Sequence, residues 1–223
     1  MKIIGHRGAR GLAPENTLAA FEKALHYRVD EIELDVRVSL DMVVLVHHDE
    51  YLRDQSGNAL SVAGHTYNEL LTHKDDLCTL EQAVRFINKR VPILIEVKPN
   101  VPVKPVINAL DGLVLDGWEP QNFLLGSFSQ KTLRQLHHQL PTIEKVVIER
   151  WSGVRGTWRA RQLGTKRINM NHLWLWSGFI KSMRRSGYRL APYTLNDATK
   201  ARRWSEYGID AVITDFPDRF DHK

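Results

Sequence analysis

Two carboxylates lie two residues apart in the segment 31–38, which reads EIELDVRV. If this segment is a strand, Glu33 and Asp35 point to the same face, because side chains alternate along a strand. The residues between them are apolar and would form the opposite, buried face. Two carboxylates on a buried strand repel each other, so a hard divalent metal ion bound by oxygen is their natural partner. The alternative is an exposed edge strand whose acids are solvated.

A third carboxylate, Glu96, lies inside the apolar segment 91–98. A charged side chain within such a strand needs a partner. Lys98 lies two residues further on, on the same face, so a simple ion pair is one interpretation. In the other interpretation, Glu96 is a third metal ligand and Lys98 contacts a phosphate group.

The segment 43–48, VVLVHH, follows the first acidic strand after only four residues. A parallel crossover needs about a dozen residues, so we expect a hairpin. The shortest turn pairs residue 38 with 43 and residue 33 with 48, which places His48 beside Glu33 and turns His47 away. A slip of one residue in this register would exchange the two histidines.

The tripeptide His6-Arg7-Gly8 follows the first apolar run of the chain. In an α/β barrel, His6 would stand at the carboxyl end of the first strand, where catalytic residues gather. Arg7 could bind a phosphate through two hydrogen bonds, and Gly8 allows another backbone to approach closely. These three residues form only a weak signal when taken alone.

Apolar strand segments alternate with amphipathic helical segments along the whole chain, which indicates a parallel sheet with helices outside it. We expect helices to start near Thr79 and Asn196. The hairpin strand is one strand too many for eight strand–helix units, and without it a closed TIM (β/α)8 barrel is favoured over an open sheet. Residues 50–78 are polar and aperiodic, and we expect a small insertion over the active end of a single domain, 1–223. The expected strands are 2–6, 31–38, 43–48, 91–98, 122–128, 144–149, 167–170, 189–194 and 210–214, and the expected helices are 16–27, 79–90, 103–117, 129–139, 155–163, 177–187 and 197–207.

The composition is that of a globular protein, with 43% hydrophobic and 26% charged residues. Residues 1–100 carry 12 Lys and Arg against 15 Asp and Glu, whereas the remainder carries 19 against 11. The basic half could attract phosphate ligands, a membrane surface or nucleic acid, or it could simply be a solvated surface. The one cysteine, Cys78, cannot form an internal disulfide. We find no signal peptide or membrane-spanning run, and a cytoplasmic protein is the simplest interpretation.

The motifs occur in an order that strongly resembles the glycerophosphodiester phosphodiesterase family. They are His6-Arg7-Gly8, Pro14-Glu15-Asn16-Thr17, Glu33-Leu34-Asp35-Val36, His47-His48-Asp49, Ile95-Glu96-Val97-Lys98 and Thr214-Asp215-Phe216-Pro217, with weaker matches at Ser127-Phe128 and Tyr193-Thr194-Leu195-Asn196. The sequence departs from the family pattern at Tyr51, Cys78 and Tyr193. These differences concern the expected pocket for the alcohol and remove none of the catalytic candidates.

The resemblance implies a TIM barrel and the metal-dependent hydrolysis of a small glycerophosphodiester to sn-glycerol 3-phosphate and an alcohol. By position, the implied ligands of a divalent metal, Mg²⁺ or Ca²⁺, are Glu33, Asp35 and Glu96. The implied acid–base pair is His6 and His48, with His6 assigned as the base. The resemblance further implies substrate contacts or supports from Arg7, Lys98, Glu15 and Asn16, and its His-Asp pattern selects His48 over His47.

Two rival functions remain. Residues 151–167 interleave basic side chains with Trp151 and Trp158 and contain no acid, which suits a lysophospholipase D acting at a membrane surface. A solvated helix with inward-facing Trp side chains would give the same pattern. The basic half would also suit a non-catalytic barrel that binds phosphate or nucleic acid, but such a protein would not need the carboxylates and histidines, so we expect no nucleic-acid partner. The oligomeric state is left open.

Overall fold

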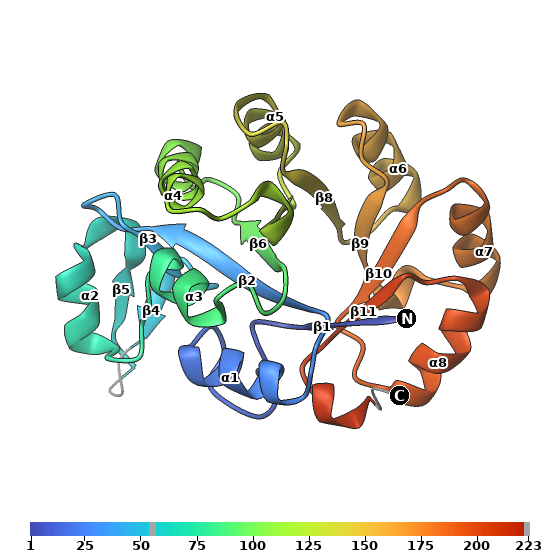
Figure 1. The fold of residues 1–223 in the computed structure, drawn as a ribbon, viewed down its shortest axis with the longest axis horizontal. Coiled ribbons are helices and arrows are strands. Elements are labelled where there is room, and N and C mark those ends of the chain that lie inside the picture. The colour runs from blue at the N-terminus through green and yellow to red at the C-terminus, as the bar shows by residue number, and fades with distance from the viewer. Residues whose placement is uncertain (54–56, 221–223) are drawn as a thin grey trace.

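The computed structural model describes residues 1–53 and 57–220. Eight parallel strands of this described part form a barrel, in the order β10-β9-β8-β7-β6-β2-β1-β11 (Figure 1). The strands are β1 Lys2–Gly5, β2 Glu31–Val38, β6 Ile93–Val97, β7 Phe123–Ser127, β8 Glu144–Glu149, β9 Arg167–Asn171, β10 Arg189–Tyr193 and β11 Ala211–Thr214. Two backbone hydrogen bonds close the ring between its ends, from Asp210 N to Leu190 O and from Leu195 N to Ile213 O, both 2.9 Å. The predicted TIM-barrel fold is confirmed.

An outer layer of helices surrounds the strands (Figure 1). Thr17, Thr79, Ser129, Ser152 and Asp197 each cap one of these helices with a side-chain oxygen. The predicted start at Thr79 is therefore right, whereas the last helix is capped by Asp197 and not by Asn196, whose side chain is engaged elsewhere. The helices are α1 Leu18–His26, α3 Leu80–Ile87, α4 Val103–Leu115, α5 Gln130–Gln139, α6 Gly153–Gln162, α7 Ser177–Arg185 and α8 Ala198–Tyr207. α4, with 13 residues, is too short to cross a bilayer, and none of the other described helices is long and apolar enough to do so.

The lower part of the barrel is filled with side chains. Glu31 at the start of β2 accepts two hydrogen bonds of 2.7 Å from Arg167 on β9, and both residues are buried. Apolar side chains such as Ile4 and Leu94 pack inside the barrel at about the same height along the strands as this ion pair. Inward-facing residues recur at every second position of β2. Glu31 therefore forms a structural ion pair at the bottom of the barrel, and Glu33 and Asp35 face the interior above it.

The hairpin after β2 forms, but its predicted register is wrong by one residue. β3, Val44–Val46, pairs with β2 so that Val38 faces Val44 and Val36 faces Val46. The turn is longer than the shortest one because the Ser39 N–H donates to Val43 O at 3.0 Å, and Met42 adopts a positive φ of 65° within it. An odd number of loop residues shifts every pair in the ladder.

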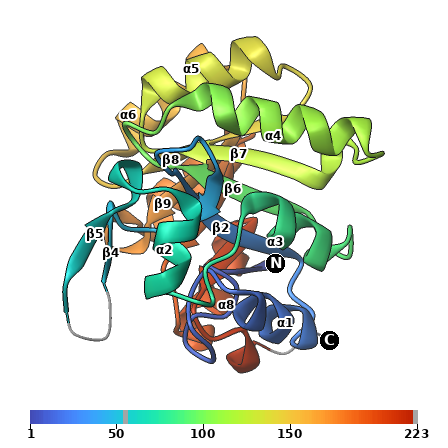
Figure 2. The same ribbon diagram turned by 90° about the vertical axis from the view of Figure 1, so that its left-hand side faces the viewer.

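The segment 50–78 contains short elements that its polar sequence did not reveal. These are β4 Tyr51–Arg53, β5 Ala59–Ser61 and α2 Tyr67–His73, with a 3₁₀ turn, η1 Val62–Gly64. A small apolar cluster holds them against β3, and its members are Leu45, Leu52, Val62, Leu70 and Leu77. Figures 1 and 2 show β4, β5 and α2 gathered as a small unit of their own beyond β3.

Candidate active site

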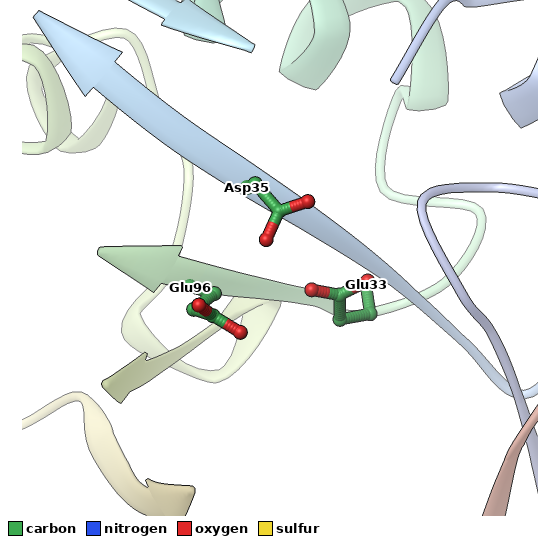
Figure 3. A group of neighbouring side chains, drawn as sticks. All are labelled: Glu33, Asp35 and Glu96. Carbon is green, nitrogen blue, oxygen red and sulfur yellow. The ribbon is translucent and has the colours of Figure 1, made fainter. Parts of the chain in front are cut away.

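Three buried carboxylates meet at the upper part of the barrel. Glu33 and Asp35 come from β2 and Glu96 from β6, and Asp35 is the direct sheet partner of Glu96. One oxygen from each of the three lies within 4.8 Å of the others, and the side chains point toward a common space (Figure 3). The predicted grouping of these acids is therefore observed, and their oxygen atoms are the donors that hard divalent cations prefer.

The cluster holds more negative charge than its protein partners neutralise. Burial, reinforced by Asp35 and Glu96, raises the pKa of Glu33 well above its usual range. Burial and Asp35 raise the pKa of Glu96 to about 7. Burial also acts on Asp35, but Lys98 and Arg7 outweigh it and hold the pKa of Asp35 well below its usual range. Because protein cations compensate only one of the three acids fully, the donor set fits a divalent cation.

Lys98 takes part in the cluster directly. Its Nζ lies 2.5 Å from Asp35 Oδ1 and 2.5 Å from Glu96 Oε1, and the side chain is buried. Lys98 forms the ion pair with Glu96 and also lines the pocket described below. The interpretation of Lys98 as an ion-pair partner and its interpretation as a phosphate contact are therefore compatible.

Arg7 joins the loop after β1 to the acidic cluster. Its backbone N–H donates to Glu33 Oε2 at 2.8 Å, while its guanidinium lies 3.0 Å from Asp35 Oδ2 and donates to Glu15 Oε1 at 2.7 Å. The loop can turn this tightly because Gly8, with φ +83°, sits against the backbone of Ala20, where a Cβ atom would come within 2.6 Å.

Asn16 and Glu15 support the site from behind. The Asn16 amide donates to Asp35 Oδ2 at 2.9 Å and accepts from the Asp35 N–H at 3.2 Å, and Asn16 itself is buried at a positive φ of 59°. Glu15 contacts Arg7 and lies 3.4 Å from Arg10 Nε. Neither residue lines the pocket, so their geometry favours orientation of Asp35 and Arg7 over substrate contact.

His6 is held by a carboxylate from the other end of the chain. Its Nδ1 donates to Asp215 Oδ1 at 2.6 Å, and Asn196 donates to the other carboxylate oxygen, Oδ2, at 2.9 Å. Asn196 also accepts from the Asp215 N–H at 2.8 Å. Burial tends to raise the pKa of Asp215, but the hydrogen bonds from His6 and Asn196 hold it below its usual range. Asp215 and Asn196 belong to motifs named in the sequence analysis, but the sequence alone did not indicate that they position His6.

His48 lines the pocket, but the predicted reason was wrong. The backbone partner of Asp35 is His47, whose N–H donates to Asp35 O at 3.0 Å, so His48 does not face Glu33 in the ladder. β3 ends at Val46, and His48 therefore leaves the strand alternation. Its Nδ1 donates to Asp49 Oδ1 at 2.7 Å, and burial lowers the pKa of its ring.

A pocket of about 200 Å³ unites these groups. The pocket lining also contains residues that the sequence did not indicate. Among them, Asn169 on β9 is 1% exposed, and neither its amide nitrogen nor its amide oxygen has a hydrogen-bond partner. The lining is His6, Arg7, Arg10, Glu33, His48, Glu96, Lys98, Phe128, Ile148, Arg150, Asn169, Tyr193, Thr194 and Ile213. A larger open hollow of about 650 Å³ between α3 and α4 holds only Glu81 and Lys104 as charged groups, which is too little for this chemistry.

A barrel whose pocket opens at the carboxyl ends of its parallel strands, with acids and histidines converging there, defines an enzyme of the TIM-barrel class. Residues 6–219 match the glycerophosphoryl diester phosphodiesterase family, so the chain belongs to that family of hydrolases. The resemblance seen in the motifs is thereby confirmed.

The four relatives and solved structures named next match over nearly their whole length. The chain is 30% identical to YhdW of Bacillus subtilis, covering 98% of this chain and 96% of that protein. It is 27% identical to a glycerophosphodiester phosphodiesterase of Bacillus altitudinis, with the same coverage. A glycerophosphodiester phosphodiesterase from Agrobacterium tumefaciens superposes with a TM-score of 0.80 at 26% identity, covering 99% and 98% of the two chains. An Oleispira antarctica phosphodiesterase, solved with the product sn-glycerol 3-phosphate, gives 0.86 at 23% identity over 98% and 94%.

Proposed function

We propose that this protein hydrolyses glycerophosphodiesters to sn-glycerol 3-phosphate and an alcohol, using a divalent cation and two histidines. The observation that carries the proposal is the convergence of three buried carboxylates and two carboxylate-bound histidines on one pocket. The Oleispira relative, which has sn-glycerol 3-phosphate bound, supports the choice of substrate.

Glu33, Asp35 and Glu96 would hold the cation, and Mg²⁺ or Ca²⁺ suits their oxygen donors. A bound cation supplies positive charge to the phosphoryl group, which otherwise repels an attacking nucleophile. Arg7 and Lys98 add positive charge at the same end of the pocket and would contact the phosphate oxygens. Asn16 and Glu15 would fix the orientation of Asp35 and Arg7 through the hydrogen bonds described above.

His6 and His48 would move the protons. In each ring Nδ1 is engaged by an aspartate, Asp215 or Asp49, which leaves Nε2 as the nitrogen available to the pocket. The aspartate orients each ring and fixes its tautomer. We assign His6 as the general base for the nucleophile and His48 as the general acid for the leaving alkoxide.

The nucleophile is either the hydroxyl of the substrate's own glycerol or a water molecule. Attack by the glycerol hydroxyl forms a cyclic phosphate, which water then opens, whereas direct attack by water does not. Detection of a cyclic glycerophosphate in quenched reactions would identify the first route.

Asn169 would recognise the glycerol part of the substrate. It lines the pocket, and both its amide nitrogen, a donor, and its amide oxygen, an acceptor, are without a protein partner. A buried amide left unpaired is costly, and a hydroxyl pair of glycerol can satisfy both of its groups.

The decisive experiment is a panel of glycerophosphodiesters assayed for released glycerol 3-phosphate, with and without Mg²⁺ or Ca²⁺. Turnover of glycerophosphocholine that is abolished by EDTA and restored by the metal is the expected result. Activity that resists the chelator would contradict the proposed role of the cation.

The second candidate is a lysophospholipase D activity, which cleaves the same type of bond in a substrate carrying an acyl chain. Human lysophospholipase D is 35% identical over 108 residues, which cover 47% of this chain and 34% of that protein. Choline release from lysophosphatidylcholine would show this activity. Membership of an enzyme family removes the basis for a non-catalytic barrel.

A further inference from the structure

A patch of large apolar side chains lies exposed beside the pocket, and we call it the aromatic rim. Its members are Trp151, Val154, Leu173, Trp174 and Trp176, with exposed fractions of 57%, 81%, 75%, 50% and 66%. These side chains do not pack inward, which excludes the solvated helix with buried Trp residues that the sequence left open. Such a cluster of exposed large apolar residues marks an interaction surface.

The aromatic rim is built by two consecutive loops at the carboxyl ends of barrel strands. Trp151 follows β8, whereas Trp174 lies in η3, His172–Trp174, which follows β9. The two rings meet edge to face with centroids 6.1 Å apart, so the loops form one continuous surface. α6 and α7, which follow these loops, are neighbours in the outer layer (Figure 1).

Arg150 connects the aromatic rim to the catalytic pocket. Its guanidinium lies 5.8 Å from the ring centroid of Trp151 and 5.4 Å from that of Phe128, and both Arg150 and Phe128 line the pocket. A surface that receives the aromatic rim would therefore be in contact with the edge of the pocket.

The rim also lies in the most basic part of the chain. Residues 150–196 contain ten Lys and Arg and no Asp or Glu, although the whole chain carries a formal charge of only +5. Exposed basic side chains also lie on the two helices behind the rim, but Arg161, Arg184 and Arg185 are in the last turns of α6 and α7, at the ends farthest from the rim. Arg155 is paired with the buried Glu149, and Lys181 lies over Tyr207. At the rim itself, the exposed Arg150 and the absence of any acid across residues 150–196 favour an anionic partner.

We propose that the aromatic rim docks the open end of the barrel onto an anionic phospholipid bilayer. Trp side chains favour the headgroup region, and basic residues add electrostatic attraction to anionic lipid. A second copy of this chain would bring Arg150 against its own counterpart and would offer no acid from residues 150–196 to pair with it, so charge complementarity favours lipid over a dimer. The inference rests on the proposed function and adds to its soluble substrates phosphodiesters presented at a lipid surface, such as lysophospholipids.

The test is flotation of the full chain with phosphatidylcholine vesicles, with or without phosphatidylglycerol. The wild type should float only with the anionic vesicles, and added salt should weaken the binding. Leu173→Ser/Trp176→Ser should reduce partitioning by about tenfold or more, since two apolar side chains no longer enter the interface. The matched control is Leu115→Ser, because Leu115 is 88% exposed at the end of α4, away from the rim, and this variant should float like the wild type.

Hydrolysis of soluble glycerophosphocholine separates docking from catalysis. The double variant should keep that activity within about twofold, because exposed substitutions rarely disturb the fold, while its turnover of lysophosphatidylcholine in anionic vesicles falls. Wild type that fails to float, a double variant that floats normally, or equal binding to neutral vesicles would each overturn the docking proposal. Vesicle binding by a chain inactive on every phosphodiester would uphold docking and overturn the proposed function instead. A concentration-dependent dimer lost in the double variant, without vesicle binding, would assign the rim to a second copy and overturn the proposal.

Discussion

His6 and Asp215 stand 209 residues apart in the chain, yet His6 Nδ1 lies 2.6 Å from Asp215 Oδ1. β1 and β11 are adjacent and parallel, with Gly5 opposite Thr214, so the residues that follow each strand meet at the rim of the barrel. Closure of the barrel therefore converts two distant motifs into one hydrogen-bonded pair.

Asp215→Asn should lower kcat by about a hundredfold or more, because His6 loses the carboxylate that orients its ring and fixes its tautomer. The pH profile of kcat should change, which a purely structural defect would not cause. Asp218→Asn is the matched control, since Asp218 is exposed three residues further on. Wild-type turnover in Asp215→Asn would remove Asp215 from the mechanism.

The two adjacent histidines should respond differently to substitution. His48→Ala should lose about a hundredfold to ten-thousandfold in kcat, as is typical for a general acid, and His6→Ala should lose a similar factor. His47→Ala should keep most activity, because the His47 ring lies against Tyr51 O at 3.4 Å and does not line the pocket. The same loss in His47→Ala and His48→Ala would contradict the assignment, provided that thermal melts show both variants folded.

Metal binding should depend on the acidic cluster. Adding Mg²⁺ or Ca²⁺ should raise the melting temperature of the wild type, because a ligand that binds only the folded state stabilises it. Glu96→Gln should lose this shift and the activation by metal. Glu81→Gln, an exposed acid on α3, serves as the control. A melting temperature of the wild type that ignores both ions would argue against a cation at this site.

Asn169 should act on glycerol recognition and not on the phosphodiester itself. Asn169→Leu should raise KM for glycerophosphocholine by about tenfold or more, as expected when a buried hydrogen-bonding pair is lost. Hydrolysis of bis(p-nitrophenyl) phosphate, which has no glycerol, should change little. If both substrates are affected equally, Asn169 serves the fold or the phosphate and not the glycerol.

Glu149 should give stability a pH dependence. Burial tends to raise its pKa, but hydrogen bonds from Arg155 and from the backbone of Trp151 and Ser152 lower it overall. A carboxyl whose folded-state pKa is depressed stabilises the native state above its unfolded pKa, and this contribution is lost as the pH falls through the folded value. Glu149→Gln should therefore cost about 1.5–3 kcal/mol at pH 7, since it weakens hydrogen bonds made to a charged group.

Urea unfolding of both proteins at several pH values measures this effect. The difference in unfolding free energy between wild type and Glu149→Gln should shrink as the pH falls below 4.5, the ordinary pKa of a glutamate. A difference that is the same at pH 7 and at low pH would mean that the charge of Glu149 does not contribute. Glu22→Gln, an exposed acid on α1, provides the comparison for a solvated acid.

The sequence by itself determined the barrel and the acidic cluster. Side-chain alternation in β2 puts Glu33 and Asp35 on one face in any register, and the repeated strand–helix units leave few other ways to bury both faces of the sheet. These properties are local, so they can be read from the order of residues.

Only the tertiary structure decided which groups complete the site. The turn after β2 is one residue longer than predicted, so His48 reaches the pocket because β3 ends at Val46, and not through its predicted pairing. Asp215 and Asn196 reach His6 through barrel closure, and Asn169 and the aromatic rim depend on which side chains are left without partners. Loop length, chain closure and exposure arise from long-range packing, and no local pattern of residues encodes them.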